Sequence, residues 1–518
     1  MNVGQLYAMQ ARKMRNKPAV IYRGRMLTHA ELNRLSNQLA QALLQLGYQK
    51  GEHIVILAKN HLEYPVIMLA AAKIGVSFTP LNYRLTPGEL LSIVGHCQPR
   101  GIFFTSDFTD TIHLLRKEVP VREAVLFGEE TSGGKSANGG GEGWTRLSSL
   151  LDGRPDAYPK AEVSENDLYY IGYTSGTTGR PKGAMIDHHS RYMYALVFGV
   201  EFGIGEDDVQ LVAGPLCHAA PHTMCLSQLL LGGTVVIMQE FDPEEVLQHI
   251  QTYRITNMFM APTMYNMVLQ LPEAVRDRYD VTSMKTLISA GSPLPTRVKE
   301  GIIQYFTTAG LNEFYGSTET GINLNLRPAD QLRTVRSVGK PVLFNDILIL
   351  DEHRNPVPVG EVGEIFIKNP YFFKGYLHDE EETANVFWNG YVSVGDMGQQ
   401  DEDGYYYIVD RKKDMVISGG VNIFPAEIED VLYKHPGVKE AAVIGVPDEL
   451  WGEALKAFIV PKDAELTEEM IIDFCRQHLA SYKKPKSVEF VQDLPRNPAG
   501  KILKRKLREK YWTGDVKV

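Results

Sequence analysis

Along the first part of the chain, hydrophobic positions follow the helical period in some segments and form short continuous runs in others. Residues 28–46 carry leucines at helical spacing, and Thr28 with Glu31 forms a capping box, so the pattern predicts an amphipathic helix. Three further segments predict a buried strand, a packed helix and a second strand, in that order: 51–58, 64–74 and 76–80. This alternation predicts doubly wound α/β layers.

The alternation continues through the middle of the chain. Strands are predicted at 167–173, 184–186, 233–238, 256–262 and 287–293, and helices at 188–198 and 242–253. A parallel sheet binds ligands at the carboxyl ends of its strands, so the turn at 290–292 is well placed for a site. From 339 to 376 the pattern becomes β-rich, which indicates a small subdomain.

The stretch 173–184 (YTSGTTGRPKGA) joins two predicted strands and mixes small hydroxylated residues with glycines. Its glycines permit close backbone approach, and its hydroxyls lie beside N–H groups: Thr174, Ser175, Gly176, Thr177, Thr178 and Gly179. Such a nest suits a polyanion, and Lys182 adds a point charge for a phosphate chain. Arg180 and Pro181 separate the last glycine from Lys182, so the Walker A template fails. On composition alone, a surface hairpin explains the stretch equally well.

Length, composition and charge exclude several classes of protein. The chain has 518 residues, more than one ordinary core, and its 44% hydrophobic and 23% charged residues are typical of a soluble globular enzyme. A net charge of −9 argues against nucleic-acid binding. The four cysteines have no disulfide or zinc spacing, and no signal peptide or spanning apolar run is evident. We expect a cytoplasmic, reduced protein; peripheral membrane contact stays open for a greasy substrate, and a homodimer is compatible with these properties.

Four further motifs follow the Gly-rich stretch. They are 312–320 (NEFYGSTET), 391–396 (YVSVGD), 410–425 (DRKKDMVISGGVNIFP) and 494–503 (LPRNPAGKIL). In this order the five motifs resemble those of the adenylate-forming superfamily, which comprises acyl-CoA synthetases, luciferases and the adenylation domains of peptide synthetases. The resemblance covers nearly the whole chain and is closest to the fatty-acyl-CoA ligases.

The resemblance implies a nucleotide site built from several motifs. The Gly-rich loop and Lys182 would hold the phosphates, and Thr318 would bind the α-phosphate. Glu319 would hold the bridging magnesium ion, since Mg²⁺ prefers oxygen ligands beside a substrate phosphate. The other positions implied to contact the nucleotide are Gly291, Ser292, Glu313, Phe314, Tyr315, Asp396 and Arg411. Of these, Tyr315 would offer its face to adenine, and Asp396 would accept hydrogen bonds from the ribose hydroxyls.

For the acid and CoA, the resemblance implies another set of residues: His218, Gly291, Gly316, Ser418, Gly419 and Gly420. His218 would orient the acyl group or gate the access of CoA, with a hydrogen-bonded core histidine as the alternative. Gly291 would leave an acyl tunnel open, and the later glycines would permit a narrow pantetheine tunnel. Met258, Met260 and Met264 suit an adaptable apolar pocket, with plain core packing as the alternative.

The resemblance also implies a mobile, two-domain organisation. It has a large N-terminal adenylating domain, a hinge, and a small mobile α+β C-terminal lid domain, expected at 1–409, 410–413 and 414–518. Lys413 would be the pivot, and Lys501 would contact the substrate carboxylate and the α-phosphate during the first half-reaction only. The rest of the basic run 501–510 indicates a solvated helix.

These features predict an ATP-dependent acyl-CoA ligase that uses a carboxylic acid, ATP, Mg²⁺ and CoA. Medium- or long-chain fatty acids are the first candidate substrates, and aryl acids of the benzoate or cinnamate type are the alternative. Amino acids are disfavoured, because the pocket region 211–224 offers His218 and His222 but no acidic partner for an ammonium. A non-catalytic nucleotide-binding homologue is the remaining alternative. The joint presence of five residues argues against it: Lys182, Glu319, Asp396, Arg411 and Lys501.

Overall fold

The computed structural model describes residues 1–128, 143–174, 181–334, 336–418, 421–462, 465–496 and 502–512. The chain forms two units of dense internal contact. Unit 1 comprises Met1–Asp346 and Ile367–Val392, and unit 2 comprises Ile347–Phe366 and Ser393–Val518. The predicted hinge at 410–413 falls within unit 2, and its role stays a prediction.

The larger sheet of unit 1 has nine strands and a parallel centre. In spatial order they are β16 (Lys340–Pro341), β15 (Gly321–Leu326), β14 (Gly310–Ser317), β13 (Thr286–Ser289), β12 (Asn257–Met260), β10 (Val209–Val212), β11 (Thr234–Ile237), β1 (Pro18–Tyr22) and β2 (Arg25–Thr28). The strands from β14 to β1 run parallel, and antiparallel strands close both edges. β11 is buried at every position, as expected for a parallel strand covered on both faces.

The second sheet of unit 1 has seven strands. Their order is β7 (Thr145–Arg146), β6 (Glu123–Leu126), β5 (Gly101–Phe104), β3 (His53–Leu57), β4 (Ser77–Leu81), β8 (Leu168–Thr174) and β9 (Lys182–Asp187). Only β9 among these described strands is antiparallel to its neighbour. The predicted α/β layers are therefore confirmed for unit 1.

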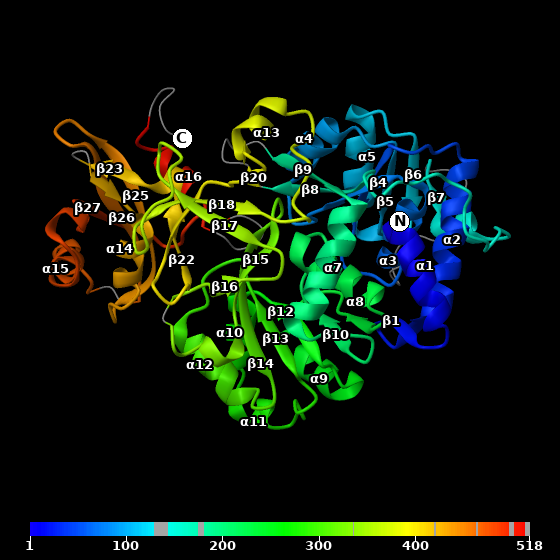
Figure 1. The fold of residues 1–518 in the computed structure, drawn as a ribbon, viewed down its shortest axis with the longest axis horizontal. Coiled ribbons are helices and arrows are strands. Elements are labelled where there is room, and N and C mark those ends of the chain that lie inside the picture. The colour runs from blue at the N-terminus through cyan, green and yellow to red at the C-terminus, as the bar shows by residue number, and fades with distance from the viewer. Residues whose placement is uncertain are drawn as a thin grey trace. The chain divides into compact units, whose positions relative to one another are not determined.

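Helices cover both sheets of unit 1. They are α1 (Val3–Lys13), α2 (His29–Gln45), α3 (Tyr64–Ile74), α4 (Pro87–Cys97), α5 (Thr109–Glu118), α6 (Leu147–Leu151), α7 (His188–Phe202), α8 (Ala219–Leu230), α9 (Pro243–Tyr253), α10 (Pro262–Leu269), α11 (Glu273–Arg276), α12 (Thr296–Tyr305) and α13 (Glu380–Val386), with 3₁₀ turns η1 (Ser106–Phe108) and η2 (Pro328–Asp330). α2 begins with the predicted capping box of Thr28 and Glu31. Figure 1 shows α7 and α8 between the two sheets, where one core cluster joins side chains of both sheets. Within this layer, α8 contacts β8 through His222 and Tyr170, and β12 through Gln228 and Asn257.

Unit 2 is α+β. Its described elements are β17 (Asp346–Leu350), β18 (Gly363–Lys368), β21 (Asp396–Gln400), β22 (Tyr406–Arg411), η3 (Lys412–Asp414), β23 (Val416–Ser418), β24 (Val421–Ile423), α14 (Pro425–Leu432), β25 (Val438–Asp448), β26 (Gly452–Pro461), α15 (Glu468–His478), η4 (Ser481–Lys483), β27 (Ser487–Phe490) and α16 (Lys504–Arg508). β17 begins in unit 1 at Asp346 and β18 ends in unit 1 at Lys368, and the short hairpin β19 (Phe387–Trp388) and β20 (Tyr391–Val392) belongs to unit 1. α14 and α15 pack on one face of the β25–β26 sheet, and Leu507 of α16 packs on the other.

The basic run at the end of the chain is not simply solvated, so that prediction is wrong for two side chains. Lys504 Nζ lies 2.8 Å from Glu429 Oε1, and Arg508 pairs with Asp414 in a buried contact. Burial would lower the pKa of Lys504, but the carboxylates of Glu429, Asp410 and Asp414 outweigh it and raise that pKa above its usual value. Charge composition alone could not reveal these partners, because they lie far away in sequence.

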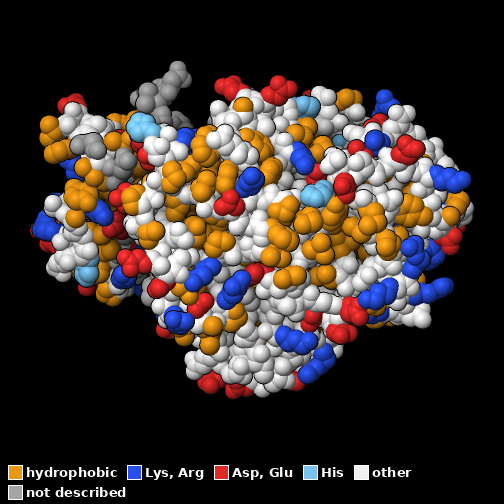
Figure 2. Space-filling model, in the orientation of Figure 1, with side chains coloured by type: hydrophobic (Ala, Val, Ile, Leu, Met, Phe, Trp, Pro, Cys, Tyr) orange, Lys and Arg blue, Asp and Glu red, His pale blue; other side chains and the backbone are white. Residues whose placement is uncertain are grey.

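Hydrophobic side chains gather over α7 on the face drawn in Figure 2. Leu196 and Val200 of α7 are 53% and 68% exposed. Within the part of the chain that the structure describes, no helix combines the length and apolar character needed to cross a membrane. Peripheral membrane contact, a homodimer and a cytoplasmic location stay predictions.

Candidate active site

The Gly-rich stretch is framed by the two strands that the sequence predicts. β8 and β9 are antiparallel, and Thr174 lies opposite Lys182 where the two strands leave the loop. The loop residues Ser175, Gly176, Thr177, Thr178 and Gly179 lie outside the described residues. The strand–loop–strand framework is therefore confirmed, while the phosphate contacts of the loop remain predictions.

Lys182 is almost fully buried at the start of β9 and already has two partners. Its ammonium pairs with Glu382, at the start of α13, and lies 5.3 Å from the centre of the Tyr376 ring. The side chains of Lys182 and Glu382 are 8% and 28% exposed. A lysine held in this way presents a fixed positive charge beside the mouth of the Gly-rich loop.

Glu319 contacts the same tyrosine, at its hydroxyl group. The Tyr376 hydroxyl donates a 2.8 Å hydrogen bond to Glu319 Oε1, and Glu319 is 7% exposed. Tyr376 therefore links the two charged residues, although the sequence did not indicate it. Its position comes from Gly375, whose φ of 132° favours glycine, and from a backbone bridge to Ala184 in β9.

Thr318 lies against the strand that leads into the Gly-rich loop. A Cβ built on Gly172 of β8 would come within 2.9 Å of Thr318 Cγ2. Gly172 thus lets the turn after β14 approach β8 closely, which brings Thr318 beside the strand that precedes the Gly-rich stretch. Gly316 has a similar role, since a Cβ there would collide with the carbonyl oxygen of Gly321.

The two residues Glu313 and Phe314, which precede this turn, have side chains that are less accessible to a nucleotide than the sequence suggests. Glu313 forms a buried 2.8 Å ion pair with Lys299 and accepts a 3.0 Å hydrogen bond from the Leu294 N–H. Phe314 is 8% exposed, and its ring centre lies 6.2 Å from that of Phe259. Both side chains are engaged within the fold, and their contact with a nucleotide stays a prediction. Tyr315 is partly exposed, as its predicted role requires.

The turn after β13 is open. Gly291 has a φ of 95°, and a Cβ built there would meet nothing within 4 Å. Ser292 is exposed beside it. The left-handed backbone explains the glycine without reference to a ligand, while the empty surroundings are compatible with the predicted access for an acid or adenine.

His218 caps the start of α8 without donating or accepting a side-chain cap bond. Burial, together with the positive charge of Arg84, lowers the pKa of His218 to about 4. The imidazole is therefore neutral at pH 7, able to donate from one ring nitrogen and accept at the other. His222, one turn later, is fully buried among the core aromatic side chains, and its ring centre lies 4.7 Å from that of Tyr170 in a tilted arrangement.

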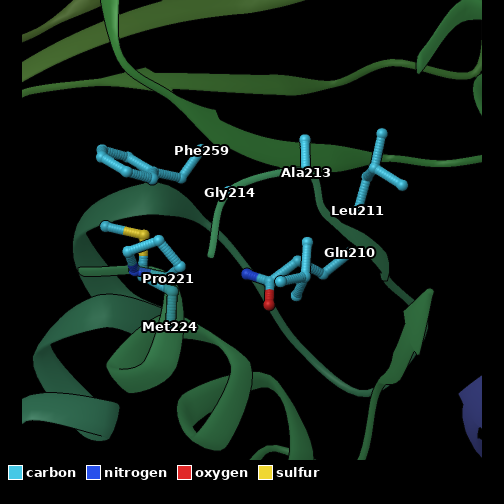
Figure 3. A pocket seen from close by; sticks show the side chains of 8 residues that line it. Gln210, Leu211, Ala213, Gly214, Pro221, Met224 and Phe259 are labelled. Carbon is cyan, nitrogen blue, oxygen red and sulfur yellow. The ribbon is translucent and has the colours of Figure 1, made fainter. Parts of the chain in front are cut away.

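A small cavity lies where β10 and β12 meet α8 (Figure 3). Its volume is about 10 Å³, and its lining side chains include Gln210, Pro221, Met224 and Phe259. Figure 3 shows the ring of Phe259 above Pro221 and Met224, with the side chain of Gln210 directed toward them. Pro221 and Met224 lie within the pocket region 211–224 that the sequence indicates, whereas Gln210 and Phe259 lie outside it and were missed.

The three methionines follow the alternative of plain core packing. Met258 and Met260 are fully buried on the opposite face of β12, in a core cluster with α9 and α10, and Met264 packs against the same cluster. Successive side chains of a strand point to opposite faces. Phe259 therefore faces the cavity, and its methionine neighbours face the core.

Two predicted nucleotide contacts come together in unit 2. Asp396 and Arg411 lie opposite each other in the β21–β22 ladder, and Arg411 Nε is 2.5 Å from Asp396 Oδ1. Lys413 is exposed in η3, and Ser418 ends β23. Three other predicted residues, Gly419, Gly420 and Lys501, lie outside the described residues.

Magnesium would fit beside Glu319. Mg²⁺ is usually bound by one or two carboxylates together with substrate phosphates and waters, so a single buried carboxylate is a sufficient protein contribution. Among the described residues there is no group of three or more histidine, cysteine, aspartate or glutamate side chains that could hold a metal by themselves. The site is suited to an ion that arrives with a phosphate-bearing substrate.

Comparison with known proteins agrees with this geometry. A family model described as AMP-binding enzyme matches residues 7–377, and one described as AMP-binding enzyme C-terminal domain matches residues 427–501. The chain belongs to the AMP-binding enzyme family. It is an adenylate-forming enzyme, of the AMP-forming acid–thiol ligase class.

Several members of the AMP-binding enzyme family resemble the chain over nearly its whole length. A feruloyl-CoA synthase of Amycolatopsis sp is 37% identical over 514 residues, which cover 98% of this chain and 99% of that protein. The long-chain-fatty-acid–CoA ligase FadD13 of Mycobacterium tuberculosis is 33% identical over 94% of this chain and 93% of that protein. The solved structure of ATP-bound MatB from Rhodopseudomonas palustris is 31% identical, covers 99% of both chains and has a TM-score of 0.87. The predicted superfamily and fold class are thus confirmed.

Proposed function

We propose that this enzyme joins a carboxylic acid with an apolar body to CoA in two steps, through an acyl adenylate. The observation that carries the proposal is the cluster formed by Lys182, Tyr376 and Glu319 next to β8. A buried cation and a buried carboxylate held by one tyrosine suit a magnesium–triphosphate, whose charges are complementary to both. Electrostatic stabilisation by such preorganised groups is commonly the largest contribution to catalysis.

In the first step, a carboxylate oxygen of the acid attacks the α-phosphorus of ATP, and the bond to the bridging oxygen breaks to release pyrophosphate. Lys182 would neutralise the departing pyrophosphate, and Thr318 would donate its hydroxyl to an α-phosphate oxygen. Glu319 would hold Mg²⁺, which when bound screens the phosphate charges from the incoming carboxylate. By resemblance, Lys501 would assist this step alone.

In the second step, the CoA sulfur attacks the carbonyl carbon of the acyl adenylate, its proton passes to solvent, and AMP leaves. Asp396 and Arg411 would hold the ribose and phosphate of AMP during both steps. The neutral imidazole of His218 would orient the acyl carbonyl. By resemblance, Ser418, Gly419 and Gly420 would line the pantetheine path, after a rotation about Lys413. No side-chain nucleophile is needed, so catalysis rests on positioning and charge neutralisation.

The acid can be fatty or aromatic, and each class has support. A relative named for long-chain fatty acids and the apolar side chains of Pro221, Met224 and Phe259 support a fatty acid. A relative named for ferulate, and the ring of Phe259 as a stacking partner, support an aryl acid. We place the aryl acid first, because the lining of the cavity also includes the amide of Gln210.

A pyrophosphate-release assay tests the proposal on fatty, aryl and amino acids, with and without CoA. We expect release with fatty or aryl acids but little with amino acids. Lys182→Met should raise the KM for ATP by roughly ten- to a hundredfold, because it removes a hydrogen bond to a charged group. Lys117→Met, at an exposed position of α5, serves as the matched control. No pyrophosphate with any acid, or an unchanged KM in Lys182→Met, would contradict the proposed function.

A further inference from the structure

One buried asparagine ties the two sheets of unit 1 together where their strands end. Asn60 follows β3 of the seven-stranded sheet, and its side chain reaches the segments that follow β10 and β11 of the nine-stranded sheet. Asn60 Nδ2 donates to the carbonyl oxygens of Gly214 and Met238, both at 2.9 Å. Asn60 Oδ1 accepts a 2.6 Å hydrogen bond from the Leu216 N–H. One side chain, in a residue that is only 2% exposed, thus holds three backbone groups of the neighbouring sheet.

The partners of Asn60 leave its amide only one orientation. A carbonyl oxygen can only accept and a backbone N–H can only donate, so the amino group must face the two carbonyls and the amide oxygen must face Leu216. Neither a carboxylate nor an apolar side chain of the same size could make all three hydrogen bonds. Because buried backbone groups are costly to leave unpaired, the loss of this amide would loosen the segments that it holds.

One of the segments held by Asn60 is the turn that leads into α8. Residues 214–218 (GPLCH) connect β10 to this helix, and His218 occupies the N-cap position. The turn is closed by a 3.0 Å hydrogen bond from the His218 N–H to the Pro215 carbonyl, and Leu216 is fully buried within it. The backbone of His218 is therefore fixed as long as the turn stays anchored.

The side chain of His218 has no anchor of its own. Its imidazole makes no capping hydrogen bond at the start of α8, and no described residue forms a hydrogen bond with the ring. The position of the ring is therefore set by the backbone that carries it, which means by the turn and by the first residues of α8.

We propose that Asn60 is a positioning residue of this enzyme: it fixes the turn 214–218 and, through that turn, the place of His218 relative to the acyl carbonyl. This inference rests on the proposed function, in which His218 orients the acyl group. Asn60 acts through backbone atoms alone and comes from the other sheet. Such a remote contact can matter for the rate, since a displacement of about 1 Å at a reacting group can cost on the order of a hundredfold.

The test is Asn60→Ala, with folding checked by circular dichroism and thermal unfolding. The probe is cinnamoyl adenylate, or palmitoyl adenylate if the wild-type enzyme uses it better. Its conversion with CoA to the thioester should become roughly ten- to a hundredfold slower. The KM for ATP in pyrophosphate release should stay close to the wild-type value, because the charged cluster around Lys182 does not include this turn.

Asn37→Ala is the matched control. Asn37 lies in α2, is 4% exposed and donates a 2.7 Å hydrogen bond to the carbonyl oxygen of Asp156. This variant also loses a buried amide with a backbone partner, so it should be less stable than the wild-type enzyme. Its thioester rate should nevertheless stay at the wild-type value.

A double-mutant cycle with His218→Ala separates positioning from a purely structural role. If Asn60 acts through His218, adding Asn60→Ala to His218→Ala should leave the thioester rate nearly as it is in His218→Ala alone. Asn60→Ser, which keeps one donor and one acceptor, should recover part of the rate.

The outcomes separate this inference from the proposed function. Additive losses in the double variant, a wild-type thioester rate in either single variant, or a KM for ATP that changes as much as the thioester rate overturns the inference but leaves an acyl-CoA ligase. If Asn60→Ala does not fold, the same cycle is measured with Asn60→Ser, and the same outcomes decide. No pyrophosphate with any acid from the wild-type enzyme means that the proposed function itself has failed.

Discussion

The charged cluster around Tyr376 and the cavity beside Gln210 differ in how their polar groups are satisfied. In the cluster, Lys182 is paired with Glu382, and Glu319 accepts a hydrogen bond from Tyr376. Beside the cavity, the buried oxygen of Gln210 has no hydrogen-bond donor among the described residues. A charged ligand that binds the cluster would thus replace existing ion-pair and hydrogen-bond partners. A ligand that reaches the oxygen of Gln210 would instead supply a hydrogen-bond donor that this oxygen lacks.

This difference has consequences for affinity and selectivity. When a ligand replaces existing partners, the binding free energy gains only the difference between the new and the old interactions. The affinity of the charged cluster for a nucleotide is therefore moderate. An unsatisfied buried acceptor instead penalises every ligand that lacks a donor, which is how a hydrogen-bonding pocket discriminates strongly between analogues. The nucleotide end would then supply the chemistry, and the cavity the choice of acid.

The largest effect is expected in β12, where two neighbouring residues test which face of the strand lines the cavity. Met260→Ala should lower the free energy of unfolding by about 2–5 kcal/mol, since it leaves a void in the core cluster. Its ratio of kcat/KM between aryl and fatty acids should stay at the wild-type value. Phe259→Ala, the adjacent residue on the other face, should change that ratio. Denaturant unfolding and the two-acid assay measure both effects; an altered ratio in Met260→Ala would place the methionines in the acid pocket.

The framework of the site could be predicted from sequence, because its signals are local. The strands around the Gly-rich loop follow from apolar runs beside glycines, and the turn with Thr318 and Glu319 follows β14 directly. Tyr376 could not be found in this way. It contacts Glu319 across 57 positions of sequence, and only the folded chain brings the two together.

The face of β12 that lines the cavity could not be predicted, for a different physical reason. A parallel strand buried on both faces shows no alternation of polar and apolar residues, so sequence cannot say which side chains face which helix. In β12 the methionines looked like pocket residues, but Asn257 and Phe259 face α8 instead. The buried polar residues of the cavity region, Gln210, Asn257 and Gln228, were the available signal, since strand and helix interiors rarely hide amides without a reason.

The second-largest effect is expected at Glu319, in the charged cluster. Glu319→Gln should lower the rate of adenylate formation by roughly 100- to 1000-fold, because a preorganised charge at the phosphates is lost. The amide oxygen can still accept the Tyr376 hydroxyl hydrogen bond, so the fold should persist. A magnesium titration of pyrophosphate release measures the effect, and Glu300→Gln, exposed in α12, is the control. Near-normal turnover at low magnesium would remove Glu319 from the metal site.

The smallest effect is expected at Glu382, which forms an ion pair with Lys182 in this structure. Glu382→Gln removes a negative charge beside the predicted phosphate site. ATP can then bind Lys182 without breaking an ion pair. A partly exposed pair contributes about 0.2–1 kcal/mol, so the KM for ATP should fall by roughly two- to fivefold. The change should shrink at high ionic strength, since salt screens exposed charges. Glu381→Gln, its exposed neighbour in α13, has the same change in net charge and should leave the KM closer to the wild-type value. A higher KM in Glu382→Gln alone would mean that this carboxylate orients Lys182 toward the phosphates. The ion pair would then preorganise the charged cluster for ATP, and it would not compete with ATP for Lys182.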